Sequence, residues 1–359
     1  MKKTILSILK YLFFFGLGIF LVWWQFSKMT SNEKTQFVES LHHANYWLLI
    51  PVIIIAFLSH ISRAVRWKIL IEPMGYKPST ATTFYSVMCG YFVNTFVPRG
   101  GEILKCSLMH RYEKIPMNKL VGTILIERVF DLVCYFVLII FTILIQINYV
   151  SHFVHEKFEN LITAKHGTPL WIKVIGVLLI VILLIMLIKW IFKKYAHHRH
   201  IISIKGFHLG LAEGFRTIKK LKNRGWFLAH TFFIWMMYLL EIYVGFSALE
   251  ATSHLNIIHA CSVLSLATLG MIVSPGGIGA FPLAVQEVLK IYDIDNVSFG
   301  WLIWGVSTGI ILAGGIFSFI MLLYKNKQMH LTKSLQAEII EDMKIKSSTN
   351  NPEPLYDNE

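Results

Sequence analysis

The chain has 359 residues, of which 55% are hydrophobic and only 15% are charged, and its formal net charge is +13. Soluble domains carry about 25% charged residues, and several apolar runs here reach the roughly 20 residues that cross a bilayer. The composition therefore excludes an ordinary soluble domain and predicts an all-α polytopic membrane protein. The basic residues gather in loops beside apolar spans, which anionic lipid explains, so no nucleic-acid partner is expected.

The first predicted span runs from Ile5 to Phe26, directly after Lys2 and Lys3. Its apolar run of about 22 residues exceeds that of a signal peptide, and no A-x-A-like cleavage site follows it, so we expect an uncleaved span. A loop of mixed charge, Ser27 to Asn45, leads to a second span, Tyr46 to Leu70.

Two arginines, Arg63 and Arg66, lie near the end of this second span, and Lys68 follows them. Basic residues at the end of a span usually mark the cytoplasmic interface. A substrate-binding role for the two arginines is the alternative, because charge at membrane depth is costly and usually functional.

The next apolar stretch, Thr82 to Val97, is only about 16 residues long, which is short for a crossing and typical of a re-entrant segment. A second short helix is predicted from Gly101 to Arg111. The polar and turn-forming residues of this broken stretch are Asn94, Pro98, Arg99, Gly100, Gly101, Glu102 and Lys105.

This turn has the properties of an anion-binding site. Gly100 and Gly101 permit a sharp reversal of the chain after the helix-stopping proline. The helix that starts near Gly101 would point its free N–H groups and positive dipole end at the turn. With Arg99 and Lys105 beside it, a phosphate is the ligand that we expect there.

The following span, Lys119 to Ile147, carries Glu127, Arg128 and Asp131 near its start. Glu127 and Asp131 share one helix face, and two buried carboxylates need a cation. Arg99, Arg63, Arg66 and a cationic headgroup are all candidates for that role. A purely structural pair between Arg128 and Glu102, across the two helices, is a further possibility.

In the second half, Trp171 to Phe192 is the cleanest span, and a strongly basic loop reaches from Lys189 to Arg224. Trp226 to Leu249 is the next span and contains Glu241, a candidate functional acid. Another short apolar stretch, Ile257 to Val273, ends in a glycine-rich turn.

That turn contains Pro275, Gly276, Gly277 and Gly279, which can cradle a headgroup or simply allow close packing. A short helix from Phe281 to Tyr292 follows and carries Glu287, a second candidate acid. The last span is Trp301 to Tyr324. The domains are then an integral membrane region, 1–325, and a cytoplasmic tail, 326–359, which is expected to be largely disordered.

The distribution of basic residues decides between two topologies. If all eight apolar stretches crossed fully, the basic loop would lie outside, against the positive-inside rule. If the two short stretches are re-entrant hairpins, six spans remain, and the basic regions and both termini are cytoplasmic. The two halves then form an inverted repeat with opposed broken helices, which is a transporter design.

The sequence contains none of the catalytic or cofactor motifs that we sought, so no cofactor is expected and enzymatic activity is the less favoured reading. The string Asp293-Ile294-Asp295 resembles the metal site of sugar-nucleotide enzymes, but it falls in a short connection that this topology places outside, where nucleotide sugars are absent. The four cysteines and the scattered histidines are interpreted as buried thiols and loop residues, and no metal site is expected.

Four motifs, in order, resemble the membrane region of the lysylphosphatidylglycerol synthase family, also called flippase-like proteins. They are Arg63-x-x-Arg66-Trp67, Asn94-x3-Pro98-Arg99-Gly100-Gly101-Glu102, Glu127-Arg128-x-x-Asp131 and Ser274-Pro275-Gly276-Gly277-Ile278-Gly279-Ala280-Phe281. In two-domain members this region flips an aminoacylated phospholipid that a cytosolic transferase domain makes. The resemblance covers residues 5–325 and no such transferase domain is present, so the chain is not expected to aminoacylate lipid itself.

The resemblance implies a lipid translocase of the inner membrane that binds an anionic phospholipid or a polyprenyl-linked lipid. Stand-alone relatives are linked to polyprenyl-phosphate sugar pathways. A membrane enzyme or an accessory subunit of such a glycosyl-transfer or lipid-modification pathway is therefore the alternative. A glycosyltransferase or a lipid-modifying enzyme is the protein partner that would fit it.

Overall fold

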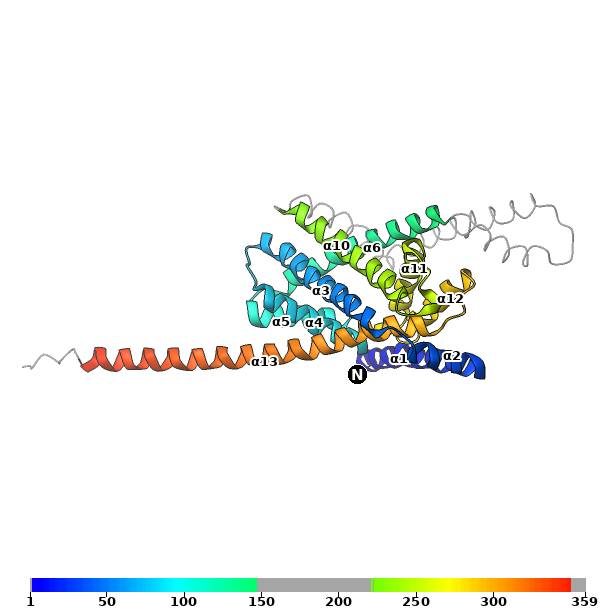
Figure 1. Cartoon of the computed structure of the whole chain (residues 1–359). Helices are drawn as coiled ribbons and strands as arrows, with labels where there is room; N and C mark the ends of the chain where they lie inside the picture. The colour runs from blue at the N-terminus through cyan, green and yellow to red at the C-terminus, as the bar shows by residue number, and fades with distance from the viewer. Residues whose placement is uncertain (1, 147–220, 222, 350–359) are drawn as a thin grey trace, which may run out of the picture.

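The computed structural model describes residues 2–146, 221 and 223–349, and all its regular elements over these ranges are helical (Figure 1). This agrees with the predicted all-α class. Ten α-helices and four short 3-10 helices make up these ranges. The predicted span Trp171 to Phe192, and the basic loop up to residue 220, lie outside the described residues.

Two helices form the N-terminal region, α1 (Lys2–Lys28) and α2 (Ser31–His42). The first contains the predicted span Ile5 to Phe26, whereas the second replaces the loop that was expected from Ser27 to Asn45. The start of α2 is a capping box, in which Thr30 Oγ1 accepts the N–H of Glu33 and the Glu33 carboxylate accepts the N–H of Thr30. These two bonds satisfy donors that a helix start otherwise leaves free.

The first broken stretch forms a helical hairpin of α4 (Thr80–Phe96) and α5 (Gly100–Glu113). It follows α3 (Leu49–Ile71) and the 3-10 turn η2 (Glu72–Met74), and α6 (Met117–Ile145) comes after it. Residues 46–48 form η1 at the start of α3. The hairpin packs on α3, on α6 and on the last helix.

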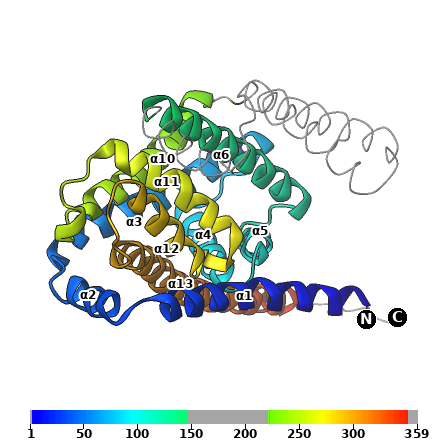
Figure 2. The same ribbon diagram turned by 90° about the vertical axis from the view of Figure 1, so that its right-hand side faces the viewer.

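The second half begins with α10 (Arg224–Phe246), which lies along α3 (Figure 1). After the turn η3 (Glu250–Thr252), the helices α11 (Ile257–Val273) and α12 (Ala280–Ile291) form the second hairpin around η4 (Pro275–Gly277). This hairpin lies between α6, which contacts α11, and α1, which contacts α12 and η4 (Figure 2).

The last helix, α13, runs without a break from Ser298 to Thr349 and extends well beyond the rest of the bundle (Figure 1). It contains the predicted span Trp301 to Tyr324. The backbone over residues 326–349 is helical, whereas the sequence was interpreted as a largely disordered tail from residue 326. Polar composition predicted disorder in this segment, but α13 continues through it from the preceding span.

Four segments of the described residues are long and apolar enough to cross a membrane: Tyr46–Met74, Met117–Ile145, Arg224–Phe246 and Ser298–Gln328. The apolar helix α11, with 17 residues, is shorter. Large apolar side chains on the outer faces of the long helices are exposed, such as Leu144, Phe232 and Ile320. An apolar outer surface of this kind matches a lipid environment rather than water, and the chain is a multi-pass membrane protein.

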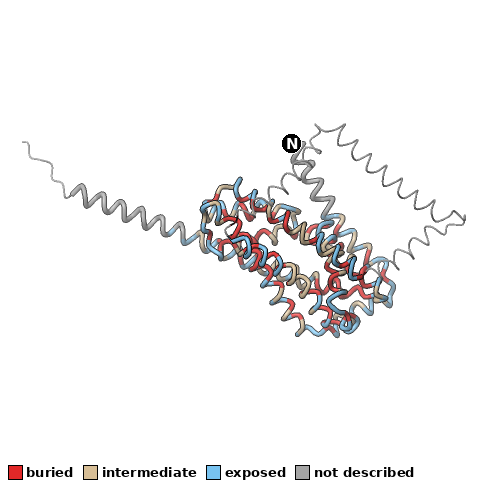
Figure 3. Tube along the Cα trace, turned by 90° about the horizontal axis from the view of Figure 1, so that it is seen from above, coloured by how far each residue is buried: buried red, intermediate tan, exposed pale blue. Residues whose placement is uncertain are grey.

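Buried residues follow the inward sides of the helices (Figure 3). One apolar core joins α3, α10, α11, α12 and α13 around Phe246 and Phe299. A second core, around Trp67 and Met109, joins α3 to the first hairpin and α6. A third, around Phe130 and Phe227, joins α3, α6 and α10. The second and third cores share α3 and α6, and these two helices also carry the buried charged residues Arg63, Arg66 and Glu127.

Candidate functional site

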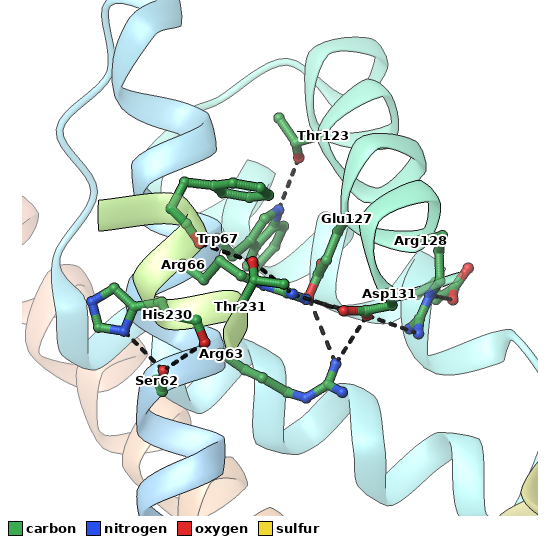
Figure 4. Close-up of polar contacts among 12 residues, drawn as sticks. Ser62, Arg63, Arg66, Trp67, Thr123, Glu127, Arg128, Asp131, His230 and Thr231 are labelled. Carbon is green, nitrogen blue, oxygen red and sulfur yellow. Dashed lines mark hydrogen bonds and ion pairs between the residues drawn. The ribbon is translucent and has the colours of Figure 1, made fainter. Parts of the chain in front are cut away.

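Five charged residues from three helices meet in the protein interior, and all of them except Lys105 are labelled in Figure 4. We call them the buried charge cluster: Arg63 and Arg66 of α3, Lys105 of α5, and Glu127 and Asp131 of α6. The spacings of three residues on α3 and four on α6 put each pair on one helix face. The helix surfaces that face each other across this part of the bundle are therefore charged.

Arg66 joins the two carboxylates of α6. Its Nη2 lies 3.0 Å from Glu127 Oε1 and its Nη1 lies 2.7 Å from Asp131 Oδ1, and its side chain is fully buried. Thr231 of α10 accepts a further, longer bond from Nη1 at 3.4 Å. The two short charge-assisted bonds are the strong ones and join α3 to α6, and the longer bond adds α10.

Lys105 is bound to the other oxygen of Glu127, with its Nζ 2.9 Å from Oε2. Its ammonium also lies 4.2 Å from the centre of the Trp67 ring, and that indole donates a hydrogen bond to Thr123 Oγ1 at 2.8 Å. Both oxygens of Glu127 are thus occupied by cations from different helices. Glu127 therefore joins the first hairpin to α3 through these contacts.

Arg63 is held differently. Its Nε donates to the hydroxyl of Tyr238 at 2.5 Å, and its nearest carboxylate oxygen is Asp131 Oδ2 at 3.5 Å. The guanidinium lies 5.3 Å from the Tyr238 ring and 5.7 Å from the ring of Tyr91. Three cations face two carboxylates in the cluster, so it carries one excess positive charge.

A second ion pair lies beside the cluster, nearer the surface. Arg128 Nε is 2.8 Å from Glu102 Oε1, and the two side chains are 43% and 27% exposed. This is the pairing across helices that the sequence left open. Since Arg99, Glu102 and Lys105 follow one another at intervals of three residues, charged groups lead from the hairpin turn to the buried Glu127.

The hairpin turn itself is closed by Asn94, whose side-chain oxygen accepts the N–H of Gly101 at 2.8 Å. The N–H of Gly100 is bonded to the carbonyl of Val97 at 3.0 Å. Two of the amide groups that were expected to bind a phosphate are therefore already satisfied within the protein. Arg99 is exposed, has left-handed backbone geometry at φ 63°, and makes no ion pair within the described residues.

The two hairpin turns meet. A Cβ on Gly276 of η4 would lie 3.1 Å from the Cα of Thr95 at the end of α4, and the carbonyl of Gly276 accepts the indole N–H of Trp304 at 2.8 Å. A Cβ on Gly279 would lie 2.8 Å from the carbonyl oxygen of Gly18 on α1. The glycine-rich turn thus lies against other parts of the backbone, and Pro275 and Gly277 in it are buried.

The remaining acids predicted from the sequence lie apart from the cluster. Glu241 is buried on α10 and accepts a hydrogen bond from Ser307 of α13. Glu287 is exposed on α12 and pairs with Lys290, 3.5 Å away. Pro98 is half-buried in the first turn. A pocket of about 410 Å³ also lies away from the cluster, between α2 and residues 293–298, where it includes Glu33 and Asp295.

Sequence reasoning missed the residues of α4 and α10 that face the cluster. Tyr91 on α4 and Thr231 and Tyr238 on α10 contact its arginines. A sequence pattern on α10 could have indicated them. Thr231, Tyr238 and Glu241 are polar residues in an apolar helix, and their spacings of seven and three residues place them on one helix face.

The whole chain was compared with known proteins. The family model of the lysylphosphatidylglycerol synthase TM region matches residues 7–323. The chain belongs to this family. All four motifs that carried the resemblance lie inside the match. A UPF0104 membrane protein of Methanocaldococcus jannaschii is 24% identical over 296 residues, which cover 77% of this chain and 81% of that protein. No solved structure matches the chain.

Membership of the lysylphosphatidylglycerol synthase TM family confirms the membrane class and the resemblance that the sequence indicated. The cluster residues Arg63, Arg66, Lys105, Glu127 and Asp131 all lie within the family region. The family match and the geometry of the buried charge cluster are independent observations that concern the same part of the chain.

Proposed function

We propose that this protein is a lipid translocase of the inner membrane, which moves a lipid with a phosphate-containing headgroup between leaflets. The observation that carries the proposal is the buried charge cluster, with its excess of positive charge inside a bundle of apolar helices. Charged groups inside a membrane are rare and costly, and they mark the paths of polar substrates. A family named for a lipid synthase agrees with a lipid substrate.

The arrangement of charges supports a route for the headgroup. Arg99 is exposed at the turn of the first hairpin, the pair of Glu102 and Arg128 is half-exposed, and Lys105 is buried. The headgroup is received at Arg99 and passes along these residues toward the cluster. Displacement of Glu102 from Arg128 by the phosphate would open the way at modest cost, because half-exposed ion pairs are weak.

The contact between the two hairpin turns supports the re-entrant arrangement that the sequence predicted. Broken helices that meet inside a bundle are typical of transporters with inverted repeats. Both termini are cytoplasmic in this proposal, as the positive-inside rule indicates. The partners are membrane lipids and, where the lipid is modified, the enzyme that modifies it.

The test is lipid movement in sealed liposomes that contain purified protein and a fluorescent phosphatidylglycerol, with a membrane-impermeant quencher to report the outer leaflet. We expect the wild-type protein to accelerate exchange between leaflets and Arg99→Gly to abolish it. Glycine suits the left-handed backbone at this position, so that variant loses the charge without strain. Arg99→Lys is the matched control and should keep most of the activity.

Equal lipid movement with and without protein would contradict the proposal. Formation of a new lipid product by detergent-solubilised protein would favour the alternative of a membrane enzyme, because catalysis needs no closed bilayer. If the protein is instead an accessory subunit, Arg99→Gly should change neither lipid movement nor folding.

A further inference from the structure

Arg63 is the one cation of the buried charge cluster without a short bond to a carboxylate. Arg66 lies 2.7 and 3.0 Å from its carboxylate oxygens, and Lys105 lies 2.9 Å from Glu127. The corresponding distances for Arg63 are 3.5 Å to Asp131 and 3.9 Å to Glu127. Arg66 and Lys105 therefore neutralise the two carboxylates, and the excess positive charge resides on Arg63.

Aromatic groups hold this charge without neutralising it. The faces of Tyr91 and Tyr238 lie within 5.7 and 5.3 Å of the guanidinium carbon, and the Tyr238 hydroxyl accepts the Nε proton. Ring faces attract a cation through their quadrupole and leave its N–H groups available to a stronger acceptor. Nη1 donates one long bond to Asp131 Oδ2 at 3.5 Å, so Nη2 is the nitrogen of Arg63 that has no hydrogen-bond partner among the described residues.

His60 adds an unpaired polar atom to the same place. It lies one turn before Arg63 on α3, so the two side chains share a helix face, and its ring packs on Tyr91 at a centroid distance of 5.3 Å. His60 is only 8% exposed, and its Nδ1 has no hydrogen-bond partner among the described residues. Buried polar atoms are nearly always paired, so an unpaired one beside an incompletely neutralised arginine is open to a hydrogen bond with a ligand oxygen. The Nε of Arg66 is the other atom of this region without a partner among the described residues.

We propose that His60, Arg63 and Tyr238 form a subsite for one monoanionic oxyanion, of the phosphodiester class. The inference rests on the proposed function and assigns a separate role to each residue around the headgroup. Arg63 binds the anion, His60 donates a second hydrogen bond, and Tyr238 positions the guanidinium. Arg66 and Lys105 maintain the structure.

The charge of the ligand follows from the cluster. One excess positive charge is balanced by a single negative charge, which a phosphodiester carries. A phosphomonoester with two charges would leave a net negative charge at membrane depth, where unpaired charge is costly. The planar guanidinium fork matches two oxygens of a phosphate.

The experiment measures binding by the full chain in detergent, from the shift of its unfolding temperature with ligand concentration. The probes are dihexanoyl phosphatidylglycerol, a monoanionic diester, and dihexanoyl phosphatidic acid, a monoester. Dihexanoyl phosphatidylcholine tests a diester without net charge, and inorganic phosphate tests a free anion. We expect phosphatidylglycerol to bind at least tenfold more tightly than the other three probes.

The variants separate the roles. Arg63→Gln leaves two cations and two carboxylates, so the protein should remain folded while its affinity for phosphatidylglycerol falls at least tenfold. Tyr238→Phe keeps the ring and removes the hydroxyl, and should weaken binding about threefold, as should His60→Phe. Arg111→Gln, at an exposed cation near the end of α5, is the charge-matched control and should bind like the wild type.

Unchanged affinity in Arg63→Gln would overturn the subsite, and if the wild-type protein still moves lipid in liposomes, the proposed function survives that result. Tightest binding of phosphatidic acid would overturn the monoanionic class. Equal binding of inorganic phosphate and phosphatidylglycerol, with loss of both in Arg63→Gln, would overturn the phosphodiester class and identify the free anion as the ligand of Arg63. Absence of both lipid binding and lipid movement in the wild-type protein would overturn both proposals.

Discussion

Gly90 and Gly101 bring α4 and α5 into backbone contact. A Cβ added to Gly101 would lie 1.8 Å from the carbonyl oxygen of Gly90, and one added to Gly90 would lie 2.9 Å from the carbonyl oxygen of Gly101. No side chain fits at either position without moving a helix. This contact sets the distance between the two helices, and Lys105 reaches Glu127 from the next turn of α5.

The first prediction concerns this contact. Gly101→Ala should destabilise the protein by about 3 kcal/mol, because the methyl group collides with backbone rather than with a mobile side chain. Thermal unfolding in detergent, followed by intrinsic fluorescence, measures the effect. The matched control is Gly122→Ala on the exposed side of α6, where a Cβ meets nothing within 4 Å. It should stabilise the protein by about 0.5–1 kcal/mol, and equal effects of the two substitutions would contradict the close approach.

The two arginines of α3 should differ in their effect on stability. Arg66→Gln removes one partner from each of two buried carboxylates, and breaking buried ion pairs in this way costs about 3–5 kcal/mol. Arg63→Gln removes the excess charge and mainly its aromatic contacts, at about 1 kcal/mol. Unfolding midpoints of the two purified variants, compared at one detergent concentration, test the difference. A larger loss in Arg63→Gln would mean that Arg63, rather than Arg66, neutralises the carboxylates.

The contact between the hairpin turns can be tested by cross-linking. The double variant Thr95→Cys, Gly276→Cys should form a disulfide under mild oxidation, since the Cβ of residue 276 would lie 3.1 Å from the Cα of Thr95. Intact mass under denaturing conditions, before and after reduction, reports the bond. Pairing Thr95→Cys with Gly309→Cys is the control, because a Cβ at Gly309 meets nothing within 4 Å. A disulfide in the control but not in the test pair would place the turns elsewhere.

The start of α2 should respond to acid. The pKa of Glu33 is below its ordinary value because its carboxylate accepts hydrogen bonds from the backbone and side chain of Thr30. A lowered pKa in the folded state stabilises the helix start above the ordinary glutamate pKa, and that contribution is lost as the pH falls through the lowered value. Hydrogen exchange of the Thr30 amide, corrected for intrinsic rates, should lose protection on acidification. Glu33→Gln should show no such pH dependence.

The helices were largely predictable because apolar runs and their breakers are local signals. The predicted stretch Ile257 to Val273 has the same ends as α11, since Asn256 caps its start and Ser274-Pro275 ends it. The missed helix α2 had a readable signal as well, the pair Thr30 and Glu33 at capping-box spacing. The helix beyond residue 325 was missed because composition was given more weight than continuity with the preceding span.

The site was predictable in part. Spacing alone placed Glu127 and Asp131 on one helix face and required a cation for them. It could not choose among Arg99, Arg63 and Arg66, because which helices lie against α6 depends on contacts between distant segments. The expected phosphate site at the start of α5 differs from the observed turn, where Asn94, seven residues earlier, accepts the amide of Gly101.

By itself the sequence determined the membrane class, the family motifs, most of the apolar helices and the faces on which charged residues lie, because periodicity, helix breakers and hydrophobic length act locally. Only the tertiary structure decided that Arg66 and Lys105 neutralise Glu127, that Arg63 remains between Tyr91 and Tyr238, and that the turn at Gly276 meets Thr95. Those pairings join helices far apart in the chain. They depend on packing, where glycine contacts and buried charge fix which helix lies beside which.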